Sequence, residues 1–539
     1  MREPQALMTA RQRWTLIAAI LGSGIVFLDS TVVNVALPKI GRELPSSLFG
    51  VLEGQSYIYN GYLLTVSALL ILAGALNDFY GRKRMFTLGL AGFLVTSLLC
   101  GLAPNMELLV LFRVLQGVAG ALLVPGSLAL LTVTFTGEAQ GRAFGLWAAA
   151  SAATTILGPF VGGILVDSIS WRAAFLINVP LLIVALWATA THVQESRDED
   201  ASGRFDWLGA LVVALAVGGL SFGAIYGQQR EWKDPLGFVM LGIGAVATIA
   251  LPILMTRRAD PLIPPELFGS RNFTVTNIST FLIYGALYVL GYFITLFVQG
   301  TVGFTAAAAG LAFLPSGLFL VVLSSRFGAL AGKYGPKAFM AIGPALMCIG
   351  TLWYLRVPAT TSPWLFAFGD PGSYLPPASW FIDFLPASLL FGFGLSIMVA
   401  PLTTALMTSV PAKNSGVASA INNAISRVGP QLAGAVIFIA ITTSFYAGLH
   451  DRAPQLDPNN PEVRKTYAPL NVVDPCRGNV PCPQSAAAVA QAQREASTDA
   501  FHLAMLISAG LLAAGAAVNG LGIKNRPAPQ PAEAQRAAA

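Results

Sequence analysis

The feature that most constrains this chain is a series of long apolar runs. Stretches of about 20 mostly apolar residues follow one another almost from end to end, with short polar segments between them. A helix of that length matches the hydrocarbon thickness of a bilayer. Only 11% of the 539 residues are charged, whereas soluble domains carry about 25%. The sequence therefore predicts an all-α integral membrane protein and excludes a soluble one.

Taken one by one, the apolar runs predict fourteen membrane-spanning helices. They cover residues 14–37, 56–76, 85–103, 107–131, 142–166, 172–190, 206–226, 236–255, 273–297, 305–325, 337–356, 382–408, 415–445 and 501–522. The runs at 305–325 and 415–445 are the least regular, because they carry polar residues and much Gly and Ala. Packed membrane helices tolerate such residues. Twelve or thirteen spans remain the alternative count.

Lys and Arg are concentrated on one side of these predicted spans. That side holds both chain ends, the run Arg82-Lys83-Arg84, and the pair Arg257 and Arg258. Cytoplasmic loops carry such an excess, so we expect both termini in the cytoplasm and the chain in the inner (plasma) membrane. No cleavable signal peptide is expected. The net charge of +6 then reflects topology and anionic lipid, and no nucleic-acid partner is needed to explain it.

The four cysteines and three histidines give little sign of a special site. Cys476 and Cys482 fall in the one long loop, 446–500, which the topology places outside the cytoplasm. A disulfide between them is plausible in an oxidising compartment, and two free thiols are the equal alternative. The spacing of Cys and His predicts no metal site. The Pro- and Ala-rich tail, 524–539, is expected to be disordered and cytoplasmic.

Two similar stretches predict an internal repeat. Residues 74–84 have the sequence GALNDFYGRKR after the second run, and residues 328–337 have GALAGKYGPK after the tenth. Many transporters consist of two such halves packed about a central cavity. We therefore expect an N-terminal six-helix bundle over 1–190, two linking spans over 191–272 and a C-terminal six-helix bundle over 273–523.

The residue types in the first copy predict a conformational switch on the cytoplasmic face. Gly74 and Gly81 let two helices approach and the chain turn sharply. Asp78 can form a charge network with Arg82 and Arg84 that breaks and reforms between conformations. A basic run after an apolar span is usually only a topology signal, but the complete pattern over 74–84 is more specific.

With these stretches in place, the sequence resembles the major facilitator superfamily and, within it, the fourteen-helix drug:proton antiporter family. The resemblance extends from about Trp14 to Ile523. Besides the switch loop, it rests on LDSTVVNVALP at 28–38, RVLQG at 113–117, Gly145 with GPFVGG at 158–163, WRAAFLINVP at 171–180, FDWLG at 205–209 and GVASAINNAISR at 416–427. The resemblance implies a fold of two six-helix bundles with two extra central helices, and export in exchange for protons.

The fifth run matches the antiporter motif of that family, which implies a hinge. The matching residues are Gly145, Gly158, Pro159, Gly162 and Gly163. Proline removes a backbone donor and kinks a helix, while glycines permit close packing and bending. Such a helix can rock against its partner in the other half as access alternates. Tight packing alone would also demand the glycines, and we expect a combined role.

Ionisable residues inside the apolar runs are candidate coupling residues, because charges are costly in a bilayer. Asp29 is expected to bind a proton or a cationic substrate, with a capping or packing role near the outer end as the alternative. Arg113 has no acid one turn away, so we expect a partner across the bundle. The family implies that Arg113 serves in proton relay, and a strut to backbone carbonyls is the equal alternative. Arg427 is expected near the cytoplasmic end, with its guanidinium at the membrane surface.

Together these features predict a proton-coupled secondary exporter of amphipathic or cationic small molecules that works by alternating access within a lipid bilayer. A dedicated exporter of a lipid, siderophore or peptide is the alternative within transport. We expect no enzyme, because no catalytic constellation is visible, and a receptor fits the repeat less well. No nucleotide-binding pattern GxxxxGK(S/T) occurs, so nucleotide hydrolysis is not expected to be the energy source. No cofactor is expected either. The sequence does not tell whether a periplasmic adaptor protein takes part.

Overall fold

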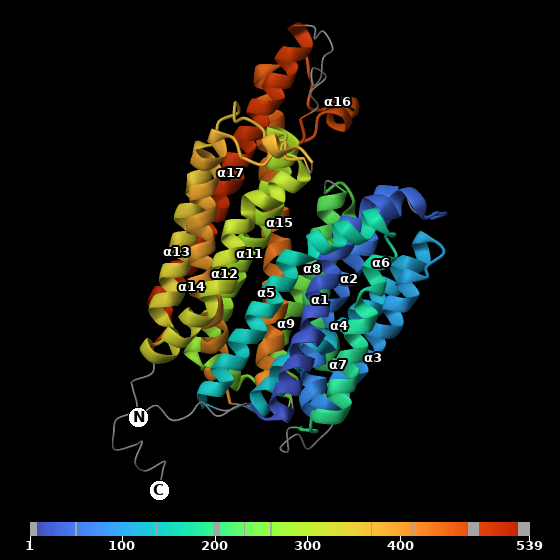
Figure 1. Cartoon of the computed structure of the whole chain (residues 1–539), viewed down its shortest axis with the longest axis vertical. Helices are drawn as coiled ribbons and strands as arrows, with labels where there is room; N and C mark the ends of the chain where they lie inside the picture. The colour runs from blue at the N-terminus through green and yellow to red at the C-terminus, as the bar shows by residue number, and fades with distance from the viewer. Residues whose placement is uncertain are drawn as a thin grey trace.

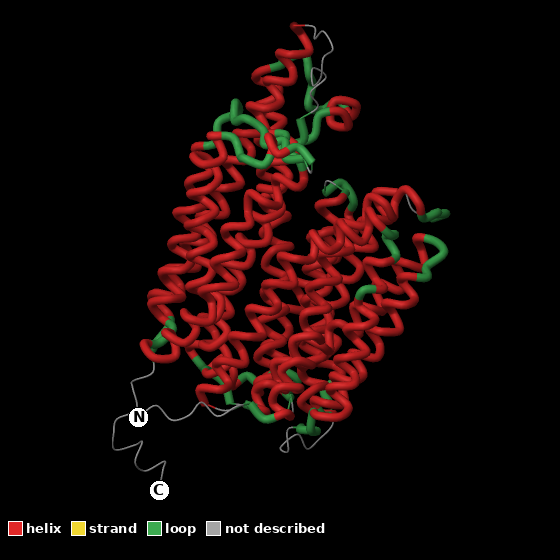
Figure 2. Tube along the Cα trace, viewed as in Figure 1, coloured by secondary structure: helices red, strands yellow, loops and turns green. Residues whose placement is uncertain are grey.

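The structure is a computed structural model, and its described part is almost entirely helical (Figure 2). It describes residues 8–48, 51–135, 137–197, 205–230, 232–258, 261–367, 369–411, 414–472 and 484–525. The first part of the chain forms α1 (Ala10–Glu43), α2 (Val51–Tyr80), α3 (Arg82–Gly101), α4 (Met106–Thr134), α5 (Gly137–Ser168), α6 (Ala173–Leu176) and α7 (Asn178–His192).

The remaining helices continue in the same pattern of long elements joined by short turns. They are α8 (Trp207–Gln229), α9 (Pro235–Arg257), α10 (Glu266–Gly269), α11 (Arg271–Leu296), α12 (Ala306–Tyr334), α13 (Lys337–Trp353), α14 (Leu385–Thr408), α15 (Ser415–Arg452), α16 (Pro461–Thr466) and α17 (Gln484–Gly522). A π-helical segment, Phe297–Val302, extends α11, and another, Trp380–Phe384, leads into α14.

Polar residues at the ends of the apolar runs fix where several helices begin. Thr9 caps α1 and forms reciprocal hydrogen bonds with Gln12, in which each side chain accepts from the backbone amide of the other residue. Two amides at the start of the helix thereby gain a partner. Asn105, Asp234 and Thr305 each accept a backbone hydrogen bond at the start of α4, α9 and α12. The boundaries of the spans are thus set by side-chain caps as well as by hydropathy.

The described helices confirm the predicted membrane-spanning class. Thirteen of them are long and apolar enough to cross a bilayer, and the number reaches fourteen when the bent α5 is counted as one span. The two least regular runs of the sequence form α12 and α15, both of which meet this criterion. The protein is therefore a multi-pass membrane protein.

Part of the stretch predicted as the long loop 446–500 is helical instead. α15 continues to Arg452, and α17 already begins at Gln484. Arg452 pairs with Glu495 and Asp499 of α17, at 3.1 and 2.6 Å. The start of α17 is polar and rich in Ala, so the hydropathy of the sequence did not predict it as part of a helix. It projects beyond the other helices at the top of Figure 1.

The helices form two groups that lie side by side (Figure 1). α1 to α7 belong to one group and α11 to α17 to the other. α8 packs against α2 of the first group and α15 of the second, while α9 packs on α8. The start of α1 and the end of α17 lie at the same end of the molecule, at the bottom of Figure 1. We call this end the base.

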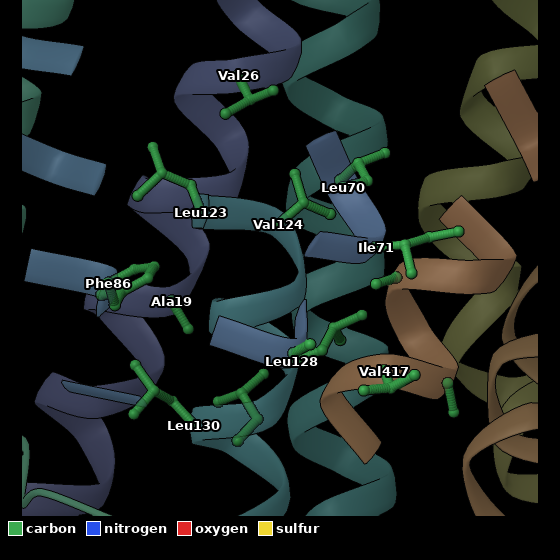
Figure 3. Close-up of a cluster of buried hydrophobic side chains, with 14 of the residues drawn as sticks. Ala19, Val26, Leu70, Ile71, Phe86, Leu123, Val124, Leu128, Leu130 and Val417 are labelled. Carbon is green, nitrogen blue, oxygen red and sulfur yellow. The ribbon is translucent and has the colours of Figure 1, made fainter. Parts of the chain in front are cut away.

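The two groups share apolar packing towards the base. The main core of the first group includes Val26, Leu70 and Phe86, and it also contains Val417 of α15 (Figure 3). On α2, Gly74 lies against Ala420 and Gly416 of α15, where an added Cβ would come within 2.8 Å of the Gly416 carbonyl oxygen. The small side chains therefore let α2 and α15 approach closely.

The repeated loops adopt matching backbone conformations. Gly81 joins α2 to α3 with a φ of 108°, and Gly335 joins α12 to α13 with a φ of 85°. L-residues with side chains rarely occupy this region, so each turn requires glycine. This agreement supports the internal repeat that the sequence predicts.

Candidate functional site

A buried ion pair links α1 to α4. Arg113 donates from Nη1 to Oδ2 of Asp29 at 2.5 Å, and neither side chain is exposed. Asp29 sits in the middle of α1, away from both helix ends, so it does not act as a helix cap. The partner predicted for Arg113 across the bundle is therefore Asp29.

Three further polar side chains surround this pair. Asn178 and Gln116 donate to Oδ1 of Asp29 at 3.0 and 3.3 Å. Gln116 also donates to the Ser97 hydroxyl at 2.9 Å. The Asp29 carboxylate thus accepts three hydrogen bonds from α4 and α7, which is the kind of environment that keeps a buried charge in place.

The guanidinium of Arg113 has contacts on each side. Its Nε donates to the carbonyl oxygen of Ile58 at 3.2 Å, and its Nη1 also donates to Oε1 of Gln116 at 2.6 Å. Its Cζ lies 4.1 Å from the ring centroid of Tyr62, a cation–π distance. Arg113 is thus both an ionic partner and a strut to a backbone carbonyl, so the two predicted roles are combined in one side chain.

This arrangement can respond to a proton. A buried carboxylate that loses its charge no longer attracts the cation beside it, so a proton on Asp29 would release Arg113 from its main partner. Because α1, α4 and α7 all contribute to the cluster, its breakage would loosen contacts among three helices. The geometry is thus suited to coupling protonation to helix movement.

The switch loop lies where the two groups of helices meet near the base. Arg82 donates from Nε and Nη2 to Oδ1 of Asp78, at 3.0 and 2.9 Å. The Asp78 carboxylate also faces the start of α15, where a Cβ added to Gly416 would lie 2.8 Å from its Cγ. A helix N-terminus attracts negative charge. Arg84, in contrast, has an exposed side chain, and of these two arginines Arg82 is the one that pairs with Asp78.

The segment that follows α7 closes over this loop. The carboxylate of Glu195 accepts hydrogen bonds from the backbone amides of Lys83 and Arg84, at 3.0 and 3.1 Å. The amide of Arg82 donates to the carbonyl oxygen of Ser196 at 2.8 Å. Glu195 therefore caps α3 from outside its own helix, a feature that the sequence analysis missed.

The second half repeats this closure with a different residue. Asn525, beyond the end of α17, accepts a hydrogen bond from the amide of Lys337 at 3.1 Å and donates to the carbonyl oxygen of Tyr334 at 3.2 Å. Glu195 and Asn525 each lie three residues after the last residue of their helix. An acid in one half corresponds to a neutral amide in the other.

The glycines of α5 differ in their surroundings. A Cβ on Gly158 would lie 2.8 Å from Cβ of Thr31, and one on Gly162 would lie 3.0 Å from Cα of Val32. Both contacts are with α1, close to Asp29. Gly145 instead faces Ser325 of α12 in the other group, while no described residue of a neighbouring element lies within 4 Å of a Cβ on Gly163.

The predicted kink of α5 is present. The segments Arg142–Thr155 and Phe160–Val166 are bent by 42° relative to each other. The break between them contains Gly158 and Pro159, as expected for a helix whose proline cannot donate to the preceding turn.

Comparison with known proteins gives this architecture its family. A model of the Major Facilitator Superfamily matches residues 19–434, most of the chain. The chain belongs to the major facilitator superfamily. This assignment agrees with the repeated switch loop and with the helical architecture.

Relatives within the superfamily are named for drug resistance and export. The multidrug resistance protein Stp of Mycobacterium tuberculosis is 32% identical over 80% of this chain and 76% of its own length. The tetracenomycin C resistance and export protein of Streptomyces glaucescens is 31% identical over 89% and 86%. The crystal structure of the human organic anion transporter MFSD10 covers 95% of this chain and all of that one, with a TM-score of 0.56 at 14% identity. That last likeness is one of fold.

The structure brings together some of the predicted site residues of this transporter and separates others. Asp29 and Arg113 meet, and so do Asp78 and Arg82, whereas Arg84 stays apart. Cys476 and Cys482 lie outside the described residues, so their pairing stays a prediction.

Sequence reasoning missed several members of the buried cluster. Gln116 and Asn178 were noticed only as parts of motifs, and Ser97 was not noticed. A polar side chain inside an apolar run was the available signal, since such groups need partners in a membrane. Arg427 lies about 18 Å from the start of α15, at 1.5 Å per residue, and its Nε is buried in protein although the side chain is partly exposed. That its guanidinium reaches the membrane surface stays a prediction.

Proposed function

We propose that this transporter exports amphipathic small molecules in exchange for protons, by alternating access between two helical bundles. The single observation that carries the proposal is the buried Asp29–Arg113 pair, held by Gln116 and Asn178. A charged pair at such depth in a membrane protein is a candidate coupling site. Relatives named for drug resistance and export support the direction of transport.

A proton is a better ligand for Asp29 than a cationic substrate. The Asp29 side chain is fully buried and its carboxylate is already covered by three donors. A proton is small enough to reach such a group when the cavity opens, but a bulky cation would first have to displace Arg113. Of the two roles considered for Asp29, proton binding is therefore the one that we propose.

The switch loop and α5 are proposed to carry the movement. Asp78, together with Arg82, meets the start of α15 near the base, so separation of the two halves there must break this contact. Gly158 and Gly162 hold α5 against α1 beside Asp29, which links the hinge to the proton site. In this proposal the halves comprise residues 1–190 and 273–523, with 191–272 as the link, both termini in the cytoplasm and the chain in the inner (plasma) membrane.

A drug-susceptibility panel tests the proposed export. The chain is expressed in an efflux-deficient bacterial host, beside an Asp29→Asn variant and an empty vector. The wild-type chain should raise the inhibitory concentration of several amphipathic compounds, and Asp29→Asn at equal membrane abundance should not. Equal susceptibility of the wild-type and empty-vector strains across a broad panel would contradict export of drug-like molecules and would favour a dedicated substrate made by the cell.

A further inference from the structure

A second arginine, Arg427 of α15, is partly buried and differs from Arg113 in having no ion-pair partner among the described residues. Its Nε is buried without a hydrogen bond, and within the described residues it takes part in no ion pair. Gln431, one turn further along, has a buried Oε1 that also lacks a partner there. Unpaired polar atoms inside a membrane protein are costly, so both are expected to gain a partner during the working cycle.

The helical spacing turns these two residues towards the first half. Val417, Ala420 and Ala424 of α15 belong to the core of the first group of helices. Arg427 and Gln431 continue the same three- and four-residue spacing, so they extend that face away from the base. Arg427 is also close enough to the Tyr62 hydroxyl to interact electrostatically with it, and the Tyr62 ring in turn lies on Arg113.

The charges around this position are unequal. The negative charge of Asp29 is matched by Arg113 and two amide donors, whereas the positive charge of Arg427 is not matched by a described residue. Asp29 is therefore not free to serve as the counter-ion of Arg427 in this conformation. This face of α15 therefore offers a cation and a neighbouring acceptor, each with a buried polar atom that has no described partner.

We propose that Arg427 and Gln431 form a binding site for the acidic group of an amphipathic substrate, such as a carboxylate or phenolate on an apolar body. The guanidinium donates to the anion, and Oε1 of Gln431 accepts from a hydroxyl or amide of the same molecule one helical turn away. This inference rests on the proposed export function, since it names the substrate class of the same central site.

Two dyes with a common xanthene skeleton test the proposal in binding measurements that need no gradient. Fluorescein is anionic and rhodamine 123 is cationic, and their anisotropy is titrated with the purified full-length chain in nanodiscs. The wild-type chain should bind fluorescein more tightly. Arg427→Gln should weaken fluorescein binding about tenfold or more, the range for a lost charged hydrogen bond, and leave rhodamine 123 unchanged. Arg11→Gln, which removes an exposed cation at the start of α1, should change neither.

Arg427→Lys controls for a folding defect, because lysine keeps the positive charge but lacks the planar guanidinium group. It should weaken fluorescein binding several-fold and leave thermal stability near that of the wild-type chain. Equal weakening of both dyes by Arg427→Gln, or tighter wild-type binding of rhodamine 123, would overturn the proposal. A different outcome would separate the two proposals. If fluorescein binding is selective and depends on Arg427 but export does not respond to the pH gradient, the proposed proton coupling alone is contradicted.

Discussion

At the scale of single residues, two arginines near the centre of this transporter differ in their hydrogen-bond and ion-pair partners. Arg113 has an ionic partner, a backbone acceptor and an aromatic ring around it, whereas the buried Nε of Arg427 has no hydrogen-bond partner among the described residues. In the proposed mechanism Asp29 is the group that binds the proton, since neither arginine can lose its charge in ordinary conditions. The arginines are then fixed charges beside it.

Replacing Asp29 with Asn separates coupling from folding. The substitution keeps the shape of the side chain and leaves Arg113 without a counter-ion, which costs about 3–5 kcal/mol for a buried pair. We expect the melting temperature to fall and proton-driven exchange to be lost. The double variant Asp29→Asn with Arg113→Gln removes both charges, so it should recover most of the stability and none of the coupling. Normal exchange with wild-type pH dependence in either variant would make the pair purely structural.

At the scale of helices, glycine and proline in α5 have separate consequences. The bend of 42° lies at the break that contains Gly158 and Pro159, which the sequence predicted from the proline. Which glycine faces a neighbour could not be predicted, because the motif gives the spacing and does not give the rotation of α5 relative to α1. The structure places Gly158 and Gly162 against α1, and brings no described neighbour within 4 Å of a Cβ on Gly163.

Alanine substitutions test this difference within one motif. Gly158→Ala places a methyl group 2.8 Å from Cβ of Thr31, whose hydroxyl is fixed by the carbonyl oxygens of Phe27 and Leu28. Such overpacking costs about 1–3 kcal/mol, so the melting temperature of the purified chain should fall. Gly163→Ala is the matched control and should leave it unchanged. A larger loss for Gly163→Ala than for Gly158→Ala would show that the packing of α5 on α1 is wrongly assigned.

The hydrogen bonds from the start of α3 to Glu195 are a second feature at the scale of helices. Glu195→Ala removes the acceptor of the Lys83 and Arg84 amides, so these amides at the start of α3 should exchange with deuterium several-fold faster. Gln194→Ala changes the exposed neighbour and should leave exchange unaltered. Peptides that cover residues 81–86 report the result by mass spectrometry. Unchanged exchange in Glu195→Ala would mean that the turn at Gly81 is stable without its cap.

At the scale of the whole molecule, the sequence predicted the fold well and the site only in part. Hydropathy predicted fourteen spans, and the described residues contain thirteen or fourteen, because a bilayer leaves few alternatives for long apolar runs. The repeated loop predicted two halves. The pairing of Asp29 with Arg113 depends on how α1 and α4 are rotated, which no local pattern specifies. The polar start of α17 was missed because its helix is stabilised by ion pairs to Arg452 and carries little apolar signal.

The account depends most on proton coupling at Asp29, and everted membrane vesicles measure it directly. Vesicles that contain the chain are loaded with an acidic interior by respiration, and uptake of a fluorescent amphipathic substrate is followed before and after a protonophore. Uptake should rise with the pH gradient, stop when the gradient collapses, and be absent in Asp29→Asn vesicles of equal transporter content. Uptake that continues unchanged without any proton gradient would contradict the central claim.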